Sequence, residues 1–428
     1  MGYLELLRRN RPFRLLWAGQ VVSQLGDWFN SIALYALLLE YTGSGRAVGL
    51  ALLCQLLPIF FFGPLAGIAA DRLPRKMILI GTDLLRGLVV LGFLWADHPD
   101  RYQWCYLFLF IQVSLSAFFL PARQAALPSI ASRRELLAAN ALSGITWSVM
   151  LAAGAGLGGL VSALLGRPTA FALDAVSYFV SAAILAPLVL PREPVRKLVR
   201  STWAWTGLPD LLDGLRYLSH RPGLSSVLLV KTLWGISGGV LLLYTILGTK
   251  VFVLGRDAGL SIGLLYAARG LGAGAGPVLA RALHGDRPSS LRRGIGGGFL
   301  LAALAYLALA FTQSVPLALL LVGIAHMGGS ILWVFSTTLL HHRTDPGFSG
   351  RVFAAEQAGV TLTMAASTWW VGHAVDANTA SPQTLLAFLG ALLLLPCALW
   401  TSLQRWRPGW YLGWDSDVDL DPGDPALQ

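Results

Sequence analysis

Apolar runs long enough to cross a lipid bilayer recur along the whole chain. An α-helix needs roughly 20 residues to span the hydrocarbon core. Runs of about this length occupy residues 13–40, 47–70, 77–96, 103–120, 137–165, 170–190, 224–253, 260–283, 294–312, 315–340, 352–375 and 384–403. With 55% hydrophobic and 13% charged residues, the chain has too little polar surface to enclose these runs in a water-soluble core. The sequence therefore predicts an all-α integral membrane protein with twelve transmembrane helices.

The basic residues predict how these helices are oriented. Most of the 32 Lys and Arg residues lie in the N-terminal arm, in alternate loops and after the last run. Because cytoplasmic loops are enriched in Lys and Arg, both termini are expected in the cytoplasm, with the chain a multi-pass protein of the inner (plasma) membrane. The net charge of +10 is spread over short clusters between apolar runs, so it does not predict a nucleic-acid site.

A charged, glycine-rich stretch separates the second and third runs and continues into the third. Glycines four apart leave one helix face clear for a neighbouring helix. Asp83 and Arg86 are three residues apart, so they can pair inside the membrane. We call the following residues the loop cluster and predict that they gate the protein: Gly63, Gly67, Asp71, Arg72, Arg75, Lys76, Asp83 and Arg86.

This pattern resembles the signature of the loop between helices 2 and 3 in the major facilitator superfamily of secondary transporters. Other stretches resemble the bacterial drug and siderophore exporters of that superfamily, the drug:proton antiporters similar to macrolide-efflux proteins. These stretches are Gln24-Leu25-Gly26-Asp27, Leu120-Pro121-Ala122-Arg123-Gln124, Glu135-Leu136-Leu137-Ala138-Ala139-Asn140 and Gly350-Arg351-Val352-Phe353. The resemblance implies that the loop cluster holds the cytoplasmic side shut against the eleventh helix, with Arg351 and Glu356 as partners.

An echo of the loop cluster in the second half of the chain indicates a duplicated architecture. Gly276-Pro277 is followed by Asp286-Arg287, much as Gly63-Pro64 is followed by Asp71-Arg72. We therefore predict two pseudo-symmetric six-helix bundles, the major facilitator fold. The predicted divisions are an N-terminal bundle (1–190), a cytoplasmic linker with an amphipathic helix (191–222), a C-terminal bundle (223–404) and a disordered acidic tail (405–428).

Ionisable residues inside the apolar runs are candidates for ion coupling. A charged side chain at the centre of a membrane helix costs about 2.5–3.5 kcal/mol on insertion scales, so its presence needs a reason. Asp27 lies near the middle of the first run and Asp174 within the sixth. Both are candidate proton-coupling sites. The alternative for each is a structural hydrogen bond to a neighbouring helix.

Cations and tryptophans within the runs are candidates for a substrate cavity. A cation could attract an anionic substrate group, or it could be tied to an aspartate or to helix carbonyls. Tryptophans offer a broad apolar surface that also binds cations, although they could instead face lipid or other helices. The candidates are Trp28, Trp147, Lys231, Trp234, Arg269, Trp333 and Trp369.

Patterns typical of enzymes occur only in unsuitable places. Gly235-Ile236-Ser237-Gly238-Gly239 matches a nucleophile elbow, and Gly154-x-Gly156-x-x-Gly159 matches a dinucleotide fingerprint, but both lie inside apolar runs. We interpret them as helix-packing faces, and we expect no enzyme activity, no cofactor and no metal. No nucleotide-binding loop is present, so ATP is not expected to drive the protein directly.

The sequence as a whole predicts a secondary active transporter that works by alternating access. We expect proton-coupled export of amphipathic small molecules of the drug or siderophore type. The expected partners are a small-molecule substrate, protons and the lipid bilayer, and the expected oligomeric state is a monomer. Two alternatives stay open at this point: a translocator of lysophospholipids with the same fold, and a membrane sensor or scaffold that does not transport.

Overall fold

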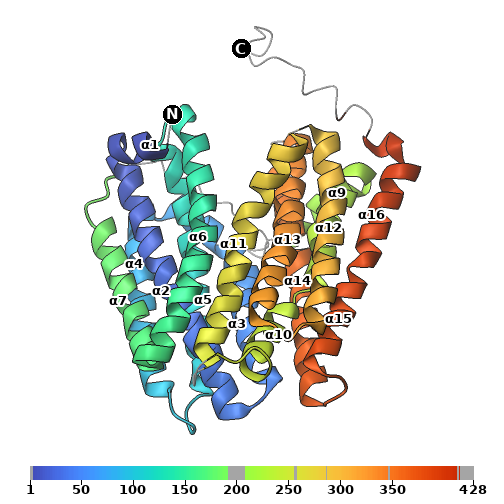
Figure 1. Cartoon of the computed structure of the whole chain (residues 1–428). Helices are drawn as coiled ribbons and strands as arrows, with labels where there is room; N and C mark the ends of the chain where they lie inside the picture. The colour runs from blue at the N-terminus through green and yellow to red at the C-terminus, as the bar shows by residue number, and fades with distance from the viewer. Residues whose placement is uncertain are drawn as a thin grey trace.

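The computed structural model describes residues 3–190, 208–254, 258–285, 287–345, 348–411 and 414, and over this part of the chain it is helical without strands (Figure 1). The helices are α1 (Tyr3–Arg9), α2 (Arg11–Thr42), α3 (Gly45–Arg72), α4 (Arg75–Ala96), α5 (Trp104–Ile130), α6 (Arg133–Leu165), α7 (Arg167–Leu185), α8 (Leu208–Ser219), α9 (Pro222–Gly235), α10 (Val240–Lys250), α11 (Ala258–His284), α12 (Pro288–Phe311), α13 (Val315–Arg343), α14 (Ser349–Asp376), α15 (Pro382–Leu392) and α16 (Leu394–Trp406), followed by the 3₁₀ turn η2 (Pro408–Tyr411).

All twelve expected spans are present among these helices. Ten segments are long and apolar enough to cross a membrane, and in two of them a broken pair, α9–α10 or α15–α16, forms one span. The 32-residue α2 and the 28-residue α14 complete the set. Both carry charged residues along their length, which lowers their hydropathy. The prediction of a twelve-span all-α membrane protein is confirmed.

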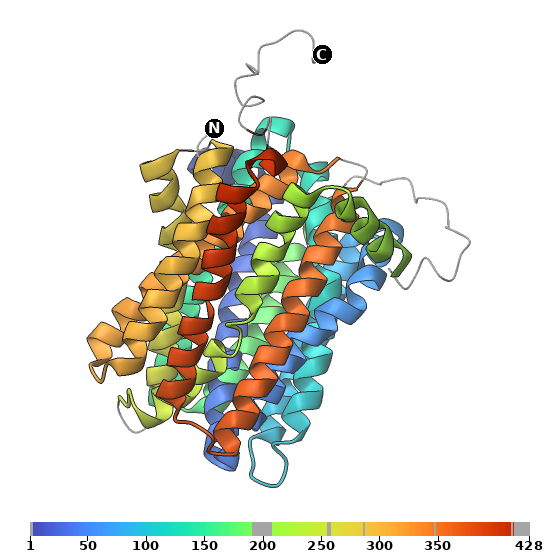
Figure 2. The same ribbon diagram turned by 90° about the vertical axis from the view of Figure 1, so that its right-hand side faces the viewer.

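The spans form two bundles, one from α2–α7 and one from α9–α16 (Figures 1 and 2). Contact between the bundles runs mainly along two helix pairs, α6 with α11 and α3 with α14. The first pair is close because of glycines: a Cβ added to Gly159 would lie 2.5 Å from the Gly259 carbonyl oxygen, and one on Gly270 would lie 2.4 Å from the Ala152 nitrogen. Gly159 is thus in a packing face, where any side chain would push the two bundles apart.

The predicted linker and tail fall partly outside the described residues, namely at 191–207, 412–413 and 415–428. The amphipathic helix expected near residues 208–218 corresponds to α8. This helix packs on the start of α14, where a Cβ on Gly214 would lie 2.8 Å from the Arg351 carbonyl oxygen. Tyr217 also stacks on Phe348, with ring centroids 4.3 Å apart.

The two bundles are joined by hydrogen bonds and an ion pair at the face opposite α1 and η2, which we call the far face. Asp376 at the end of α14 accepts hydrogen bonds from Ser44 Oγ (2.6 Å), the Gly45 amide (2.6 Å) and the Arg46 amide (3.2 Å) at the start of α3. The Arg46 side chain adds an ion pair to Asp376 (3.6 Å) and a contact to His373 Nδ1 (2.6 Å). A carboxylate at a helix N-terminus is favourable because it satisfies free amide groups there. The far face is therefore closed.

Candidate functional site

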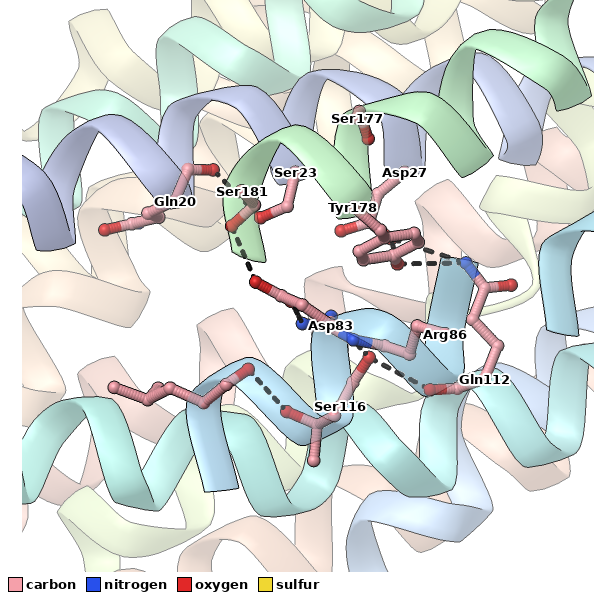
Figure 3. Close-up of polar contacts among 12 residues, drawn as sticks. Gln20, Ser23, Asp27, Asp83, Arg86, Gln112, Ser116, Ser177, Tyr178 and Ser181 are labelled. Carbon is pink, nitrogen blue, oxygen red and sulfur yellow. Dashed lines mark hydrogen bonds and ion pairs between the residues drawn. The ribbon is translucent and has the colours of Figure 1, made fainter. Parts of the chain in front are cut away.

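A network of polar side chains lies inside the N-terminal bundle, between α2, α4, α5 and α7 (Figure 3). It contains three carboxyl groups, Asp27, Asp83 and Asp174, and one cation, Arg86. Asp83, Asp174 and Arg86 are buried, and Asp27 is partly buried. So many ionisable groups inside a membrane bundle are costly unless each is paired or neutral. We call these four residues and their hydrogen-bond partners the acidic network.

Asp27 is held by residues from two other helices. The Tyr178 hydroxyl of α7 donates a hydrogen bond to the Asp27 carboxylate. Gln112 of α5 donates to the same hydroxyl (3.1 Å) and lies 3.5 Å from the carboxylate. Asn30, one turn further along α2, donates to the Gln112 carbonyl (3.1 Å). Asp27 is thus linked to α5 and α7 through neutral groups and has no direct ion pair with any described cation.

Asp83 and Arg86 form the ion pair that their spacing predicts. Ser181 of α7 donates to the other Asp83 oxygen (2.6 Å), and Arg86 donates to Ser116 of α5 (3.1 Å). The Arg86 guanidinium also lies 4.4 Å from the centre of the Tyr178 ring. These partners belong to the bundle interior and not to the loop between α3 and α4. Tyr178 therefore contacts both Arg86 and Asp27 and connects the Asp83–Arg86 pair to Asp27. The sequence alone did not predict this connection.

Asp174 is fully buried, as Asp83 is. Gln112 lies 3.5 Å from one of its oxygens, and Ser177 lies 3.5 Å from the other. The carboxyl group packs against Gly26 of α2, where an added Cβ would lie 2.5 Å from the Asp174 oxygen and 2.1 Å from Ser177 Oγ. Glycine at position 26 is what allows α7 to bring Asp174 beside Asp27.

The C-terminal bundle holds a different buried pair. Lys231 of α9 forms an ion pair with Glu356 of α14 (2.9 Å) and donates to Thr337 of α13 (2.7 Å). Its ammonium group also lies 4.6 Å from the centre of the Trp333 ring. In this conformation Lys231 is therefore tied to a glutamate, where an aspartate or helix carbonyls were the expected alternatives, and Glu356 contacts its own bundle.

Aromatic side chains fill the middle of the molecule around Arg269 of α11. Its guanidinium lies 5.7 Å from the Tyr266 ring centre, and it makes no ion pair with a carboxylate in the described ranges. Tyr266 crosses the bundle interface and lies 6.0 Å from the Trp28 ring. Trp234 is buried nearby against His326, with ring centres 6.4 Å apart. Trp369, by contrast, is exposed near the far face and stacks on a histidine.

The two glycines of the loop cluster have no close neighbour in this conformation. No atom lies within 4 Å of a Cβ built on Gly63 or Gly67, so the close helix approach expected there is not made. Arg75 donates to the Ala125 carbonyl of α5 (2.7 Å), and the side chain of Asp71 is outside the described residues. Arg72 and Lys76 are half-buried at the same helix junction.

The expected partner Arg351 lies elsewhere in this conformation. Its guanidinium is 3.8 Å from Asp213 of α8, which belongs to the same half of the chain. Glu356 is paired to Lys231 of its own bundle. The gating role of these residues stays a prediction about a different conformation.

A cavity of about 670 Å³ opens near the face that carries α1 and η2. Its lining comes from the start of α2, the end of α5 and the start of α6, with His341 from the C-terminal bundle. Among the predicted cavity residues, Trp147 lines it, whereas the other candidates occupy the positions given above. On α2 the lining includes Gln20 and, four residues later, Gln24; Asp27 follows three residues after Gln24, so all three lie on one side of the helix. The cavity and the acidic network therefore share one face of α2.

The sequence reading missed the neutral members of the acidic network. Tyr178, Gln112 and Asn30 connect the carboxyl groups, yet none carries a charge that stands out in an apolar run. A signal was available on α7, where Asp174, Tyr178 and Ser181 recur at intervals of four and three residues. Such a polar stripe on an otherwise apolar helix predicts contact with polar groups of neighbouring helices.

The comparison with protein-family models decides the family. The model described as Major Facilitator Superfamily matches residues 16–368. The chain belongs to the major facilitator superfamily. It is thus a transporter and not an enzyme. The fold agrees: the structure of a peptide transporter of the POT family superimposes with a TM-score of 0.68 at 13% identity, over 92% of this chain and 97% of that one.

Related sequences include exporters. The chain is 27% identical to the "Uncharacterized MFS-type transporter YfiS" of Bacillus subtilis over 91% of this chain and 92% of that protein. It is 26% identical to the "Enterobactin exporter EntS" of Escherichia coli over 94% and 95% of the two chains. It is also 26% identical to "Macrolide efflux protein A" of Streptococcus pyogenes over 52% and 55%. This superfamily member is therefore similar to efflux-type transporters.

Proposed function

We propose that this chain exports amphipathic small molecules from the cytoplasm in exchange for protons. The observation that carries the proposal is the charge balance of the acidic network, in which three carboxyl groups share one guanidinium. A buried carboxylate without a cation is unfavourable, so a neutral network requires two protons. Gain and loss of one of these protons is the coupling reaction that we propose.

Asp27 is the group that we propose exchanges the proton. It is the least buried of the three carboxyl groups and lies on the helix face that also lines the cavity. Asp83 forms an ion pair with Arg86 and accepts a hydrogen bond from Ser181, and the side chain of Asp174 is buried. Tyr178 would then adjust the protonation of Asp27 directly, and Asp174 would do so through Gln112. The energy is sufficient, since one charge crossing a potential of about 150 mV carries roughly 3.5 kcal/mol, enough for a gradient of several hundred-fold.

The proposed direction of transport depends on how the protein is oriented in the membrane. The basic loops favour termini in the cytoplasm, so the cavity would open to the cytoplasm while the contacts of Asp376 close the far face. This is the conformation that accepts a substrate for export. In the opposite conformation, we propose that Gly63 and Gly67 come into contact with a neighbouring helix and that the charges of the loop cluster close the cytoplasmic face.

The test is substrate-dependent proton movement in reconstituted vesicles. Purified protein is reconstituted with a pH-reporting dye inside, and amphipathic solutes of anionic, neutral and cationic charge are added in turn. We expect at least one solute to drive proton movement with the native chain and none to do so with Asp27→Asn. Unchanged proton movement in Asp27→Asn would overturn the assignment of Asp27, and the absence of any movement with a folded native protein would overturn proton exchange.

A further inference from the structure

The cavity near the face that carries α1 and η2 is lined by groups that indicate which class of ligand it binds. Its only described Lys or Arg is Arg123 of α5, and none of its described lining residues is Asp or Glu. The remaining polar lining is rich in amides, which both donate and accept hydrogen bonds. These are Gln20, Gln24, Gln124 and Asn140. The cavity thus carries a positive charge without a negative one.

Arg123 is only partly satisfied by the protein. Its Nη1 donates to the Gln20 side chain and lies 3.5 Å from Ser143 Oγ, both of which are uncharged. Its buried Nε–H has no hydrogen-bond partner in the described ranges. Arg123 is partly buried and lines the cavity without a carboxylate beside it in the described ranges, so its guanidinium is available to bind a ligand that carries a negative charge.

The other side chains that line the cavity indicate which further groups the ligand carries. Trp17 and Trp147 line the same cavity, and Trp147 is 45% exposed. Such side chains offer a flat apolar surface for a ring or an acyl group. Of the cavity's amide side chains, Gln124 and Asn140 are exposed, so they are free to bond carbonyl and hydroxyl groups of a ligand. A guanidinium binds a carboxylate through two parallel hydrogen bonds.

We infer that this cavity captures anionic amphiphiles, that is, small molecules with a carboxylate or similar acidic group beside an apolar ring system, and that Arg123 binds the acidic group. This inference rests on the proposed export function, because it names the class of substrate. A cationic amphiphile would meet an uncompensated positive charge and no described carboxylate, so the cavity discriminates against it. Capture at Arg123 and proton binding at Asp27 use different groups, with about 10 Å of helix rise between Gln20 and Asp27.

Two dyes of similar size and opposite charge test the inference directly. Fluorescein is an anionic xanthene, and rhodamine 123 is a cationic xanthene. Binding of each to the purified full chain in detergent is followed by fluorescence anisotropy. We expect fluorescein to bind and rhodamine 123 to bind at least about tenfold more weakly, and Arg123→Gln to weaken fluorescein binding by at least about tenfold, as expected for loss of a charged hydrogen bond. Arg123→Lys, which keeps the charge, should retain part of the affinity.

A second variant tests the same charge preference while Arg123 stays in place. Gln24→Glu adds a carboxylate to the cavity wall and can still accept the hydrogen bond that Gln24 takes from Gln20 (3.3 Å). We expect it to reduce the affinity for fluorescein and to raise the affinity for rhodamine 123. Equal binding of both dyes by the native chain, or an unchanged preference in Gln24→Glu, would overturn the inference.

The same dyes separate this inference from the proposed function. If rhodamine 123 is bound and is exported from vesicles in an Asp27-dependent manner while fluorescein is not, proton-coupled export stands and the substrate class is wrong. If fluorescein binds through Arg123 but no solute is moved by a pH gradient, the binding site stands and the proposed function fails.

Discussion

The two bundles share an architecture but distribute buried charge in opposite ways. The N-terminal bundle places three carboxyl groups against one guanidinium, linked through Tyr178 and Gln112. The C-terminal bundle places one ammonium against one carboxylate, Lys231 with Glu356, and leaves Arg269 among aromatic rings. The first arrangement has spare acidic sites that can gain and lose protons, whereas the Lys231 pair is balanced. Duplication of the scaffold therefore did not duplicate the chemistry, and we expect ion coupling in one half only.

The largest expected effect concerns coupling. Asp27→Asn should abolish accumulation driven by a pH gradient, which for exchange of one proton could otherwise reach about tenfold per pH unit. The matched control is the double variant Lys231→Met with Glu356→Met, which removes the balanced pair of the other bundle. Loss of the predicted gating partner Glu356 can slow its transport, but that transport should still depend on the pH gradient. Transport is measured in vesicles with an imposed pH gradient. Loss of coupling in the double variant together with normal folding would contradict a division of roles between the bundles.

The second prediction concerns the stability of the balanced pair. Lys231→Met alone should destabilise the protein by about 3–5 kcal/mol, because it leaves Glu356 charged and unpaired in an apolar interior. The double variant should recover most of this loss, since two apolar side chains replace the pair. Thermal unfolding in detergent measures both. Equal stability of the single variant and the native chain would mean that Glu356 takes up a proton readily, and the contrast between the bundles would then weaken.

The third prediction concerns the packing that brings two carboxyl groups together. Gly26→Ala places a Cβ 2.1 Å from Ser177 Oγ and 2.5 Å from the Asp174 carboxyl group, so α7 must move away from α2. Overpacking of this kind costs about 1–3 kcal/mol and should also impair proton exchange at Asp27. Gly81→Ala on α4, where no atom lies within 4 Å, is the control and should be neutral or slightly stabilising. Similar behaviour of the two variants would contradict the close contact.

The smallest effect concerns how equivalent helices begin. At the start of α6, Glu135 accepts a hydrogen bond from the Ser132 amide (2.8 Å), and this bond lowers the pKa of the carboxyl group. The start of α14, at Phe348, has no side-chain cap. A lowered pKa means that the cap stabilises fully above the unfolded value of about 4.3 and that its contribution is lost as pH falls through the folded value.

Glu135→Gln should therefore cost less than about 1 kcal/mol at neutral pH and nothing at acidic pH, where the native carboxyl group is itself protonated. Thermal unfolding of both chains across the acidic range measures the difference. A stability difference that grows toward low pH would contradict the sign of this effect.

The fold could be predicted from the sequence because membrane helices are specified locally. Each run of about 20 apolar residues satisfies its own backbone, so the twelve spans follow from length alone. The pairing of Asp83 with Arg86 followed from spacing within one helix. The breaks between α9 and α10 and between α15 and α16 were not predicted, since apolar sequence continues through both.

The site was predictable only in part because it depends on which helices are neighbours. Asp27 and Asp174 were recognised as costly in the membrane, but their approach depends on Gly26, whose role appears only when α7 is placed against α2. Lys231 was a candidate substrate contact, and its pairing with Glu356 in this conformation depends on the position of α14, which the sequence did not give. Arg123 was recognised only as part of a motif, because its lack of a counter-ion is a property of three helix ends together.

The contact of Asp376 with the start of α3 has a kinetic consequence. Two of its three hydrogen bonds come from backbone amides, so they cannot be released one at a time by side-chain rotation on α3. All of them must break as the helix withdraws, and the Arg46 ion pair must break with them. Opening of the far face therefore has to cross a barrier that includes the loss of all these contacts at Asp376.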